Sequence, residues 1–234
     1  KRQIEVLEDG KYRLILKTDA ETLSLCSLSY ERLGDADEKP VAELSYDMKL
    51  WASFNDWSGQ DMQRNGDDLI WWCEADVPAG GGEFGIKNAA MDGWYSSENN
   101  SKNIVLEEGH YMFFIELEVV DGKPVLKDEI IAEEPAYYVV GTCGNAGWAA
   151  DANAENTAYK MTEQDSKYVL TVTFTEDETV DWAENKVAFK VAYGCGGKVA
   201  NENWFGAEGM DNVTVDPGTY TITFDPATGA VTVE

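Results

Sequence analysis

Short segments of the chain alternate apolar and polar residues with a period of two. The clearest is residues 168–174, Tyr-Val-Leu-Thr-Val-Thr-Phe, and similar alternation occurs in residues 187–191 and 220–224. β-Branched and aromatic residues that alternate in this way, between Asp, Gly and Pro positions, predict antiparallel strands. No segment sustains the 3.6-residue period of a helix, so we expect an all-β protein made of antiparallel, immunoglobulin-like β-sandwiches.

Two halves of the chain match each other. Asn-Ile-Val-Leu-Glu-Glu-Gly-His-Tyr at 103–111 aligns with Asn-Val-Thr-Val-Asp-Pro-Gly-Thr-Tyr at 212–220, and Trp94 aligns upstream with Trp204. Internal matches of this kind indicate tandem copies of one unit. We expect three parts: an N-terminal hairpin and acidic linker in residues 1–44, a first β-sandwich module in residues 45–135, and a second in residues 136–234.

The N-terminal segment repeats the end of the second module. Gly-Lys-Tyr-Arg-Leu-Ile-Leu at 10–16 aligns with Gly-Thr-Tyr-Thr-Ile-Thr-Phe at 218–224. This match predicts a β-hairpin within residues 4–28. The hairpin either closes a preceding module or is captured by the first module, and in both cases we expect the chain to come from a longer, repeat-bearing protein.

Acidic residues outnumber basic ones by a wide margin. The 234 residues include 18 Lys+Arg and 44 Asp+Glu, for a net charge of −26. A nucleic-acid partner is excluded because phosphate binding needs a basic face. The charge also disfavours an anionic membrane surface, and no apolar run reaches the ~18–20 residues that span a bilayer. Such a charge suits an extracellular surface that faces a neutral polymer.

No catalytic or metal-binding motif stands out. With 44 carboxylates, pairs at a glycosidase spacing arise by chance, so the spacing alone carries no weight. The single histidine, His110, is replaced by Thr219 in the other copy, which favours a structural or surface role. There is no CxxC pair for zinc and no nucleotide-binding motif. We expect no enzyme, cofactor or metal.

The four cysteines, Cys26, Cys73, Cys143 and Cys195, leave two interpretations open. They are either reduced, small apolar core residues or disulfide partners in an oxidising compartment. If they are oxidised, we expect the pair Cys143–Cys195, because both residues fall in the second module.

Tryptophan is abundant, with eight residues, and its positions are informative. Trp71 and Trp72 are adjacent in a strand pattern, so they must face opposite sides of a sheet. Four others, Trp57, Trp94, Trp148 and Trp204, lie in segments rich in Asn, Asp, Ser and Gly, two in each module. These four either pack at the sandwich ends or stack on the apolar face of a sugar ring, with polar neighbours bonding its hydroxyls. Trp182 has no counterpart, and its role stays open.

The second module resembles a known family in the order of these motifs. Gly-Trp at 147–148, Phe-Lys-Val at 189–191, Trp-Phe-Gly at 204–206 and the Gly-x-Tyr strand at 218–224 are similar to starch-binding β-sandwich modules. Such modules accompany bacterial pullulanases and amylases and occur in SusE/SusF-type surface proteins. Residues 45–131 match with departures, and the tandem arrangement is similar to the starch-adherence proteins of gut bacteria.

The resemblance implies non-catalytic binding of starch, amylopectin or maltooligosaccharides. In this family two aromatic residues form a curved platform that fits the helical turn of an α-1,4-glucan, and a nearby Lys or Arg bonds sugar hydroxyls. Carried over, the platforms are Trp148 with Trp204 and Trp57 with Trp94. The flanking candidates are Lys190, Lys198 and Asn203 in the second module and Lys87 and Tyr95 in the first.

The spacing from lysine to tryptophan differs between the modules: Lys190 precedes Trp204 by 14 residues, whereas Lys87 precedes Trp94 by 7. We therefore expect two sites of unequal geometry. The resemblance also implies a bacterial cell-surface or secreted location, with other modules of a longer chain or an amylosome complex as partners. The alternatives are a spacer or a protein-protein or cell-wall interaction module without sugar binding, and a glycoside hydrolase.

Overall fold

The computed structural model describes residues 11–18, 25–34, 47–88, 93–97, 102–120, 123–144, 148, 156–207 and 211–234. Within these ranges the regular elements are β-strands and three-residue 3-10 helices. The all-β prediction is therefore confirmed. The chain divides into two compact units, Lys1–Ser45 and Tyr46–Glu234. No helix in the described ranges is long and apolar enough to cross a membrane.

The N-terminal unit contains an antiparallel hairpin of β1 (Lys11–Thr18) and β2 (Leu25–Gly34). The second strand extends past residue 28, which was the predicted limit of the hairpin. These two strands form a two-stranded sheet with each other. Residues 35–44, where the acidic linker is expected to follow the hairpin, lie outside the described residues.

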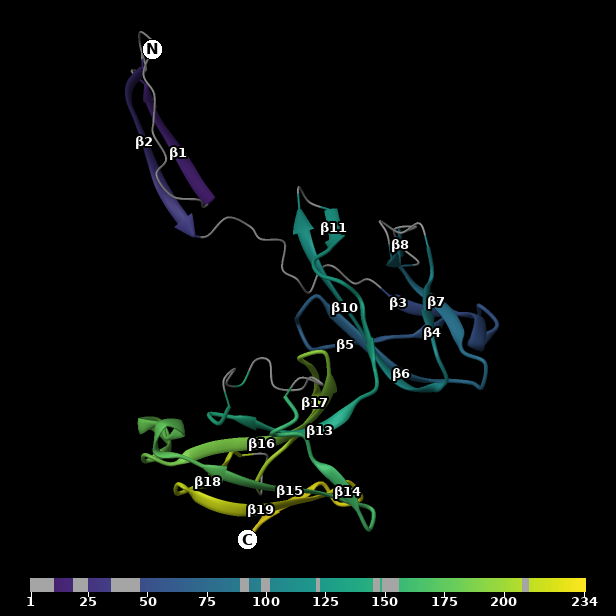
Figure 1. Cartoon of the computed structure of the whole chain (residues 1–234). Helices are drawn as coiled ribbons and strands as arrows, with labels where there is room; N and C mark the ends of the chain where they lie inside the picture. Colours follow the sequence, from purple (N-terminus) through teal and green to yellow (C-terminus); the bar gives the residue numbers. More distant parts are fainter. Residues whose placement is uncertain are drawn as a thin grey trace. The chain divides into compact units, whose positions relative to one another are not determined.

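The first sandwich of the larger unit has two antiparallel sheets (Figure 1). One sheet contains β3 (Met48–Ala52), β4 (Gln60–Asp61), β7 (Gly82–Asn88), β8 (Gly93–Tyr95) and β9 (Ile104–Leu106). The other contains β5 (Gln63–Arg64), β6 (Ile70–Val77), β10 (Gly109–Val120), β11 (Lys123–Leu126) and β12 (Ile131–Glu133).

The second sandwich repeats this arrangement. One sheet contains β13 (Ala136–Gly141), β16 (Val187–Cys195), β17 (Lys198–Phe205) and β18 (Val213–Val215). The other contains β14 (Thr162–Gln164), β15 (Lys167–Phe174), β19 (Gly218–Asp225) and β20 (Ala230–Val233). β16 pairs with β13, β17 and β18 as β7 pairs with β3, β8 and β9, so the internal match in the sequence corresponds to a repeated strand topology.

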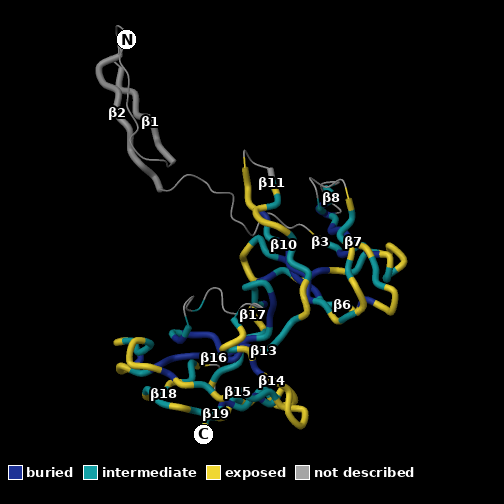
Figure 2. The backbone as a smooth tube through the Cα atoms, in the orientation of Figure 1, coloured by how far each residue is buried: buried dark blue, intermediate teal, exposed yellow. Residues whose placement is uncertain are grey.

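Strand alternation builds a separate core in each sandwich. In the first, Phe84 and Ile86 of β7 pack against Phe113 and Ile115 of β10, and all four are fully buried. In the second, the buried residues are Phe189 and Val191 of β16 with Ile222 and Phe224 of β19. Figure 2 shows the buried residues along the strands and the exposed ones mainly at loops and strand ends. The outward faces of these sheets remain available for other contacts.

The adjacent tryptophans of β6 do face opposite sides. Trp71 belongs to the first core. Trp72 is buried in another cluster, with Phe114 of its own sandwich and with Cys195 and Ala200 of the second sandwich. The two sandwiches of the larger unit therefore share an apolar contact.

The predicted Cys143–Cys195 pair is wrong. Cys143 is a buried thiol in the core of the second sandwich, whereas Cys195 is a buried thiol in the cluster around Trp72. The two thiols belong to separate buried clusters and form no disulfide. Burial and the negative charge of Glu133 raise the pKa of Cys195 to about 12, which makes it an unreactive apolar residue.

Candidate functional site

Trp148 and Trp204 lie side by side in the second sandwich. Their ring centroids are 6.4 Å apart and their planes are inclined by 44°. Trp204 projects from β17 opposite Ala192 of β16, and packs against Tyr138, Val140 and Ala192 on the sheet face away from the core. Two inclined indoles on an outer sheet face form a shallow, concave apolar surface.

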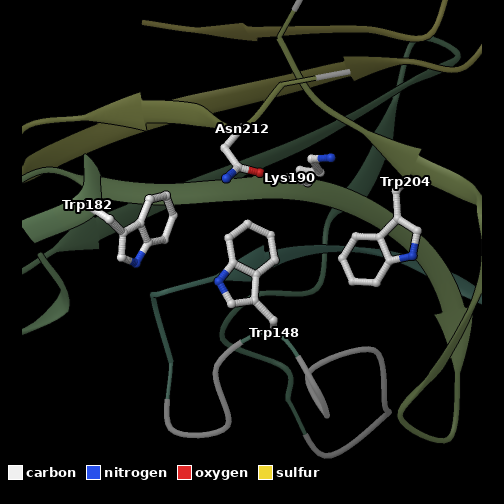
Figure 3. Close-up of a pocket in the computed structure, with 5 residues that line it drawn as sticks. All are labelled: Trp148, Trp182, Lys190, Trp204 and Asn212. Atoms are coloured by element: carbon white, nitrogen blue, oxygen red, sulfur yellow. The ribbon is translucent and has the colours of Figure 1, made fainter. Parts of the chain in front are cut away.

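An open cavity of about 420 Å³ lies over this pair. Its lining residues are Trp148, Trp182, Lys190, Trp204 and Asn212 (Figure 3). Trp148 lies between the other two indoles, and Lys190 and Asn212 lie along one side. The cavity thus combines aromatic faces with an ammonium group and an amide, which suits a ligand with both apolar faces and hydroxyl groups.

The first sandwich contains a second tryptophan pair. The ring centroids of Trp57 and Trp94 are also 6.4 Å apart, with planes inclined by 40°. Trp94 projects from β8 opposite Lys87 of β7. Its indole lies against Gly85, where an added Cβ would be only 2.2 Å from Cζ2. Glycine at this position allows the ring to lie flat on the sheet.

Trp57 is held by a turn that follows β3. Asp56 and Trp57 both have φ of 54°, in the left-handed region that non-glycine residues rarely adopt. The Trp57 N–H donates to the Ala52 carbonyl at 2.9 Å. The Asn55 amide group closes the turn, since its Oδ1 accepts from the Ala52 N–H at 3.1 Å and its Nδ2 donates to the Leu50 carbonyl at 3.1 Å. These bonds offset the cost of the unusual backbone.

Three of the residues expected at the sites lie elsewhere. Tyr95 is buried in the first core, because neighbouring strand residues alternate and Trp94 takes the outer face. Lys198 forms an ion pair with Glu116 of the first sandwich rather than lining the cavity. Asn203 is adjacent to Trp204 and does not line the cavity.

The two lysines, Lys87 and Lys190, have different register positions relative to the tryptophans of their own sandwiches. Lys87 is directly opposite Trp94 across the strand pair, whereas Trp204 is opposite Ala192, two residues beyond Lys190. The indole pairs nevertheless have the same centroid separation. The aromatic surface is therefore repeated more faithfully than the position of the cation beside it.

Trp182 and Asn212 were not among the predicted site residues. Trp182 lies in a connection between β15 and β16 that has no counterpart of equal length in the first sandwich, so the repeat gave no hint of it. Asn212 immediately precedes β18, and its partner in the sequence repeat is Asn103 before β9. The recurrence of asparagine at this place in both copies could have identified Asn212 as a candidate site residue.

Glu178, four residues before Trp182, joins its own connection to two other segments of the second sandwich. Its Oε1 accepts from the Gly144 N–H at 3.1 Å and from the Tyr159 hydroxyl at 3.0 Å, and its Oε2 accepts from the Thr175 N–H at 2.7 Å. Burial opposes the charge, but these hydrogen bonds outweigh it and lower the pKa of Glu178. The carboxylate thus remains ionised and anchors both segments.

Within the described ranges, no group of three or more His, Cys, Asp or Glu side chains could hold a metal ion. Fold and site together define a tandem β-sandwich protein with an indole pair on each sandwich. No protein-family model matches the chain. No curated protein matches it. Among solved structures, the chain is similar to the crystal structure of SusF from Bacteroides thetaiotaomicron, with 16% sequence identity and a TM-score of 0.32. The match covers 80% of this chain and 47% of that chain, so it spans about half of the SusF chain.

Proposed function

We propose that this chain binds starch and related α-1,4-glucans, such as amylopectin and maltooligosaccharides, without chemical turnover. The observation that carries the proposal is the indole pair, repeated in the two sandwiches at 6.4 Å with inclinations of 40° and 44°. Each indole can stack on the apolar face of one sugar ring, and two inclined planes suit a chain that curves. The resemblance of the motifs to starch-binding modules supports the same ligand class.

Polar groups beside each pair support a hydroxyl-rich ligand. Lys190 and Asn212 line the cavity at Trp148 and Trp204, and Lys87 is opposite Trp94. Ammonium and amide groups donate to hydroxyl oxygens, and the amide oxygen also accepts. The strongly negative chain suits a neutral ligand better than an acidic polysaccharide.

Two sites on one chain favour a polymer over a short sugar. A single site of this kind binds in the millimolar to micromolar range, or about −4 to −8 kcal/mol. A second site on the same chain raises the effective affinity for insoluble starch through avidity. We therefore propose a tethering role at a bacterial cell surface or in a secreted complex, with an amylosome or further modules as partners.

The test is calorimetry with maltoheptaose combined with pull-down on insoluble starch. We expect two sites per chain, and loss of one site in each of the variants Trp148→Ala and Trp94→Ala. The double variant should lose pull-down. His110→Ala, on β10 in the sheet of the first sandwich that does not contain Trp94, serves as a folded control. Unchanged pull-down in the double variant would refute the assigned sites. Binding to bare cell wall but not to starch would favour the attachment module, and release of reducing sugar would favour a hydrolase.

A further inference from the structure

Trp182 is more exposed than any other tryptophan in the chain, with 62% of its surface accessible, although it lies at the edge of the indole-lined cavity. Burying a large aromatic side chain is strongly favourable, so a tryptophan that the fold leaves in solvent needs a reason. Neither core includes it. Its exposure beside two other indoles points to contact with a ligand rather than to packing.

The backbone under Trp182 is a closed, hydrogen-bonded turn. Trp182 is the middle residue of the 3-10 helix η5 (Asp181–Ala183). The Val180 carbonyl accepts from the N–H groups of Ala183 and Asn185 at 3.1 and 3.0 Å, and the Val180 N–H donates to the Lys186 carbonyl at 3.1 Å. An indole on such a turn loses little backbone entropy when it binds a ligand.

A second anchor fixes this connection to the rest of the site. Glu178 lies in the 3-10 helix η4 (Glu176–Glu178), which precedes η5, and accepts hydrogen bonds from Gly144 and Tyr159. Gly144 precedes the segment of Trp148 in the chain. The connection that carries Trp182 is thus hydrogen-bonded to Gly144, which is four residues before Trp148 in the sequence.

The first sandwich has no equivalent of this connection. There, β6 and β7 are joined by residues 78–81, whereas β15 and β16 are joined by residues 175–186, which contain both 3-10 helices. The strand that follows this connection has the same pairing in both sandwiches, since β16 pairs with β13, β17 and β18 as β7 pairs with β3, β8 and β9. Trp182 therefore extends the aromatic surface of only one of the two sites.

We propose that Trp182 is a third stacking residue, which makes the site of the second sandwich longer than that of the first and selective for longer α-glucan segments. This proposal rests on the α-glucan binding proposed above. Figure 3 supports it, because Trp148 lies between Trp182 and Trp204, so a chain stacked on the central indole can continue to either side. Asn212 and Lys190, which line the same cavity, then hydrogen-bond to hydroxyl groups of the sugar rings stacked on these indoles.

The experiment uses the full chain with Trp57→Ala and Trp94→Ala, so that only the second sandwich is observed. Calorimetry compares maltotriose, maltopentaose and maltoheptaose. In this background we expect affinity to rise with length, and Trp182→Ala to weaken maltoheptaose binding about fivefold while leaving maltotriose unchanged, as expected for one lost aromatic contact. Trp182→Tyr should restore most of the difference. Because the Trp182 side chain is exposed, Trp182→Ala should not destabilise the fold. Equal melting temperatures of this variant and its background verify this.

The possible results distinguish failure of the third contact from failure of the proposed α-glucan binding. If the unmodified chain binds no α-glucan, the proposed function fails and the third contact fails with it. If the unmodified chain binds α-glucan, and Trp182→Ala leaves the affinity for each of the three sugars the same as in the background, only the third contact is overturned. A uniform loss at all three lengths, or no binding in the Trp57→Ala, Trp94→Ala background, would also overturn it, because the longer second site would then not exist.

Discussion

Glu178 accepts a hydrogen bond from the backbone N–H of Gly144 at 3.1 Å, across 34 residues of the chain. The same carboxylate accepts from the hydroxyl of Tyr159 and from the N–H and hydroxyl of Thr175. One ionised side chain therefore satisfies donors from three segments of the second sandwich. Charge-assisted hydrogen bonds of this kind are among the stronger polar contacts in proteins.

Replacing this carboxylate by an amide should weaken the second sandwich. In Glu178→Gln the negative charge is lost and an NH2 group faces N–H and O–H donors. We expect a destabilisation of about 1–2 kcal/mol, or roughly 2–8 °C in Tm, measured by thermal unfolding at pH 7. Glu176→Gln, in the same 3-10 helix but exposed, is the matched control and should leave Tm unchanged. Equal Tm values for Glu178→Gln and the wild type would refute the anchor.

The Tm difference between the wild type and Glu178→Gln should decrease in acid. The folded state lowers the pKa of Glu178 below its ordinary value of 4.5. The stabilisation is therefore complete above the unfolded pKa and is lost as the pH falls through the folded pKa. The Tm difference between wild type and Glu178→Gln should be constant from pH 6 to 7 and should shrink below about pH 4.5. A difference that grows in acid would contradict this assignment.

Gly85 provides a test of the first site. Its Cα lies so close to Trp94 that an alanine Cβ would be 2.2 Å from Cζ2 of the indole. Because Gly85 lies in a strand of ordinary φ, Gly85→Ala should leave the backbone in place and push the ring off the sheet. In a Trp148→Ala background, in which only the first site is left to bind, we expect about a fivefold loss of maltoheptaose affinity, equal to the loss of one stacking contact.

The control for this change is a nearby glycine with room for a methyl group. At Gly93, on the neighbouring strand β8, an added Cβ would be 3.5 Å from the ring of Tyr95, which is ordinary contact distance. Gly93→Ala should therefore bind like the background. If both alanine variants bind equally, the position of the Trp94 ring over Gly85 does not matter for binding.

Much of the fold follows from local sequence signals. Alternation in segments such as 168–174 predicted the strands, and the match between 103–111 and 212–220 appears in the structure as β9 with β10 and β18 with β19. The pairing of Trp148 with Trp204 and of Trp57 with Trp94 could also be anticipated, because recurrence at matching places marks positions that serve the same purpose in each copy.

Some residues expected at the sites have contacts that the local sequence does not reveal. Lys198 appeared to be a site residue from its position before Trp204, but its partner is Glu116 in the other sandwich, 82 residues away. Tyr95 was placed beside Trp94 although strand alternation sends its ring into the core. Trp182 was missed because it lies in a loop that the repeat does not share.

His110 links two carboxylates across β6 and β10. Its Nδ1 is 2.8 Å from Oδ1 of Asp76 and its Nε2 is 3.1 Å from Oε2 of Glu74. Burial opposes protonation, but the hydrogen bonds and the charges of both carboxylates outweigh it and raise the pKa of His110 above 6.5. NMR titration gives this pKa directly, because His110 is the only histidine of the chain.

The stability that His110 contributes should be present in acid and lost toward neutral pH. A raised pKa stabilises the fold fully below the unfolded value of 6.5, and the contribution disappears as the pH rises through the folded pKa. Solvent screens these exposed groups, so the effect on unfolding should stay below about 1 kcal/mol. Asp76→Asn should lower the titration midpoint. A midpoint at or below 6.5 in the wild type would refute the pairing.

Trp72 offers a test of the contact between the two sandwiches. Its indole is buried with Met112 and Phe114 of the first sandwich and with Cys195 and Ala200 of the second. Polar contacts flank this cluster. The Asn201 N–H donates to Oδ1 of Asn65 at 2.7 Å, and Lys198 pairs with Glu116. An interface with an apolar centre and satisfied polar groups at its margin should couple the unfolding of its two sides.

Trp72→Ala should therefore destabilise both sandwiches, although Trp72 belongs to the first. Truncation leaves a cavity at the shared cluster and costs about 3–5 kcal/mol, as for other buried tryptophans. In differential scanning calorimetry we expect the single transition of residues 46–234 to split into two, because each sandwich retains a core of its own. Trp182→Ala removes an equally large but exposed indole, and should leave the transition unchanged. A single, unshifted transition in Trp72→Ala would show that the shared cluster does not couple the unfolding of the two sandwiches.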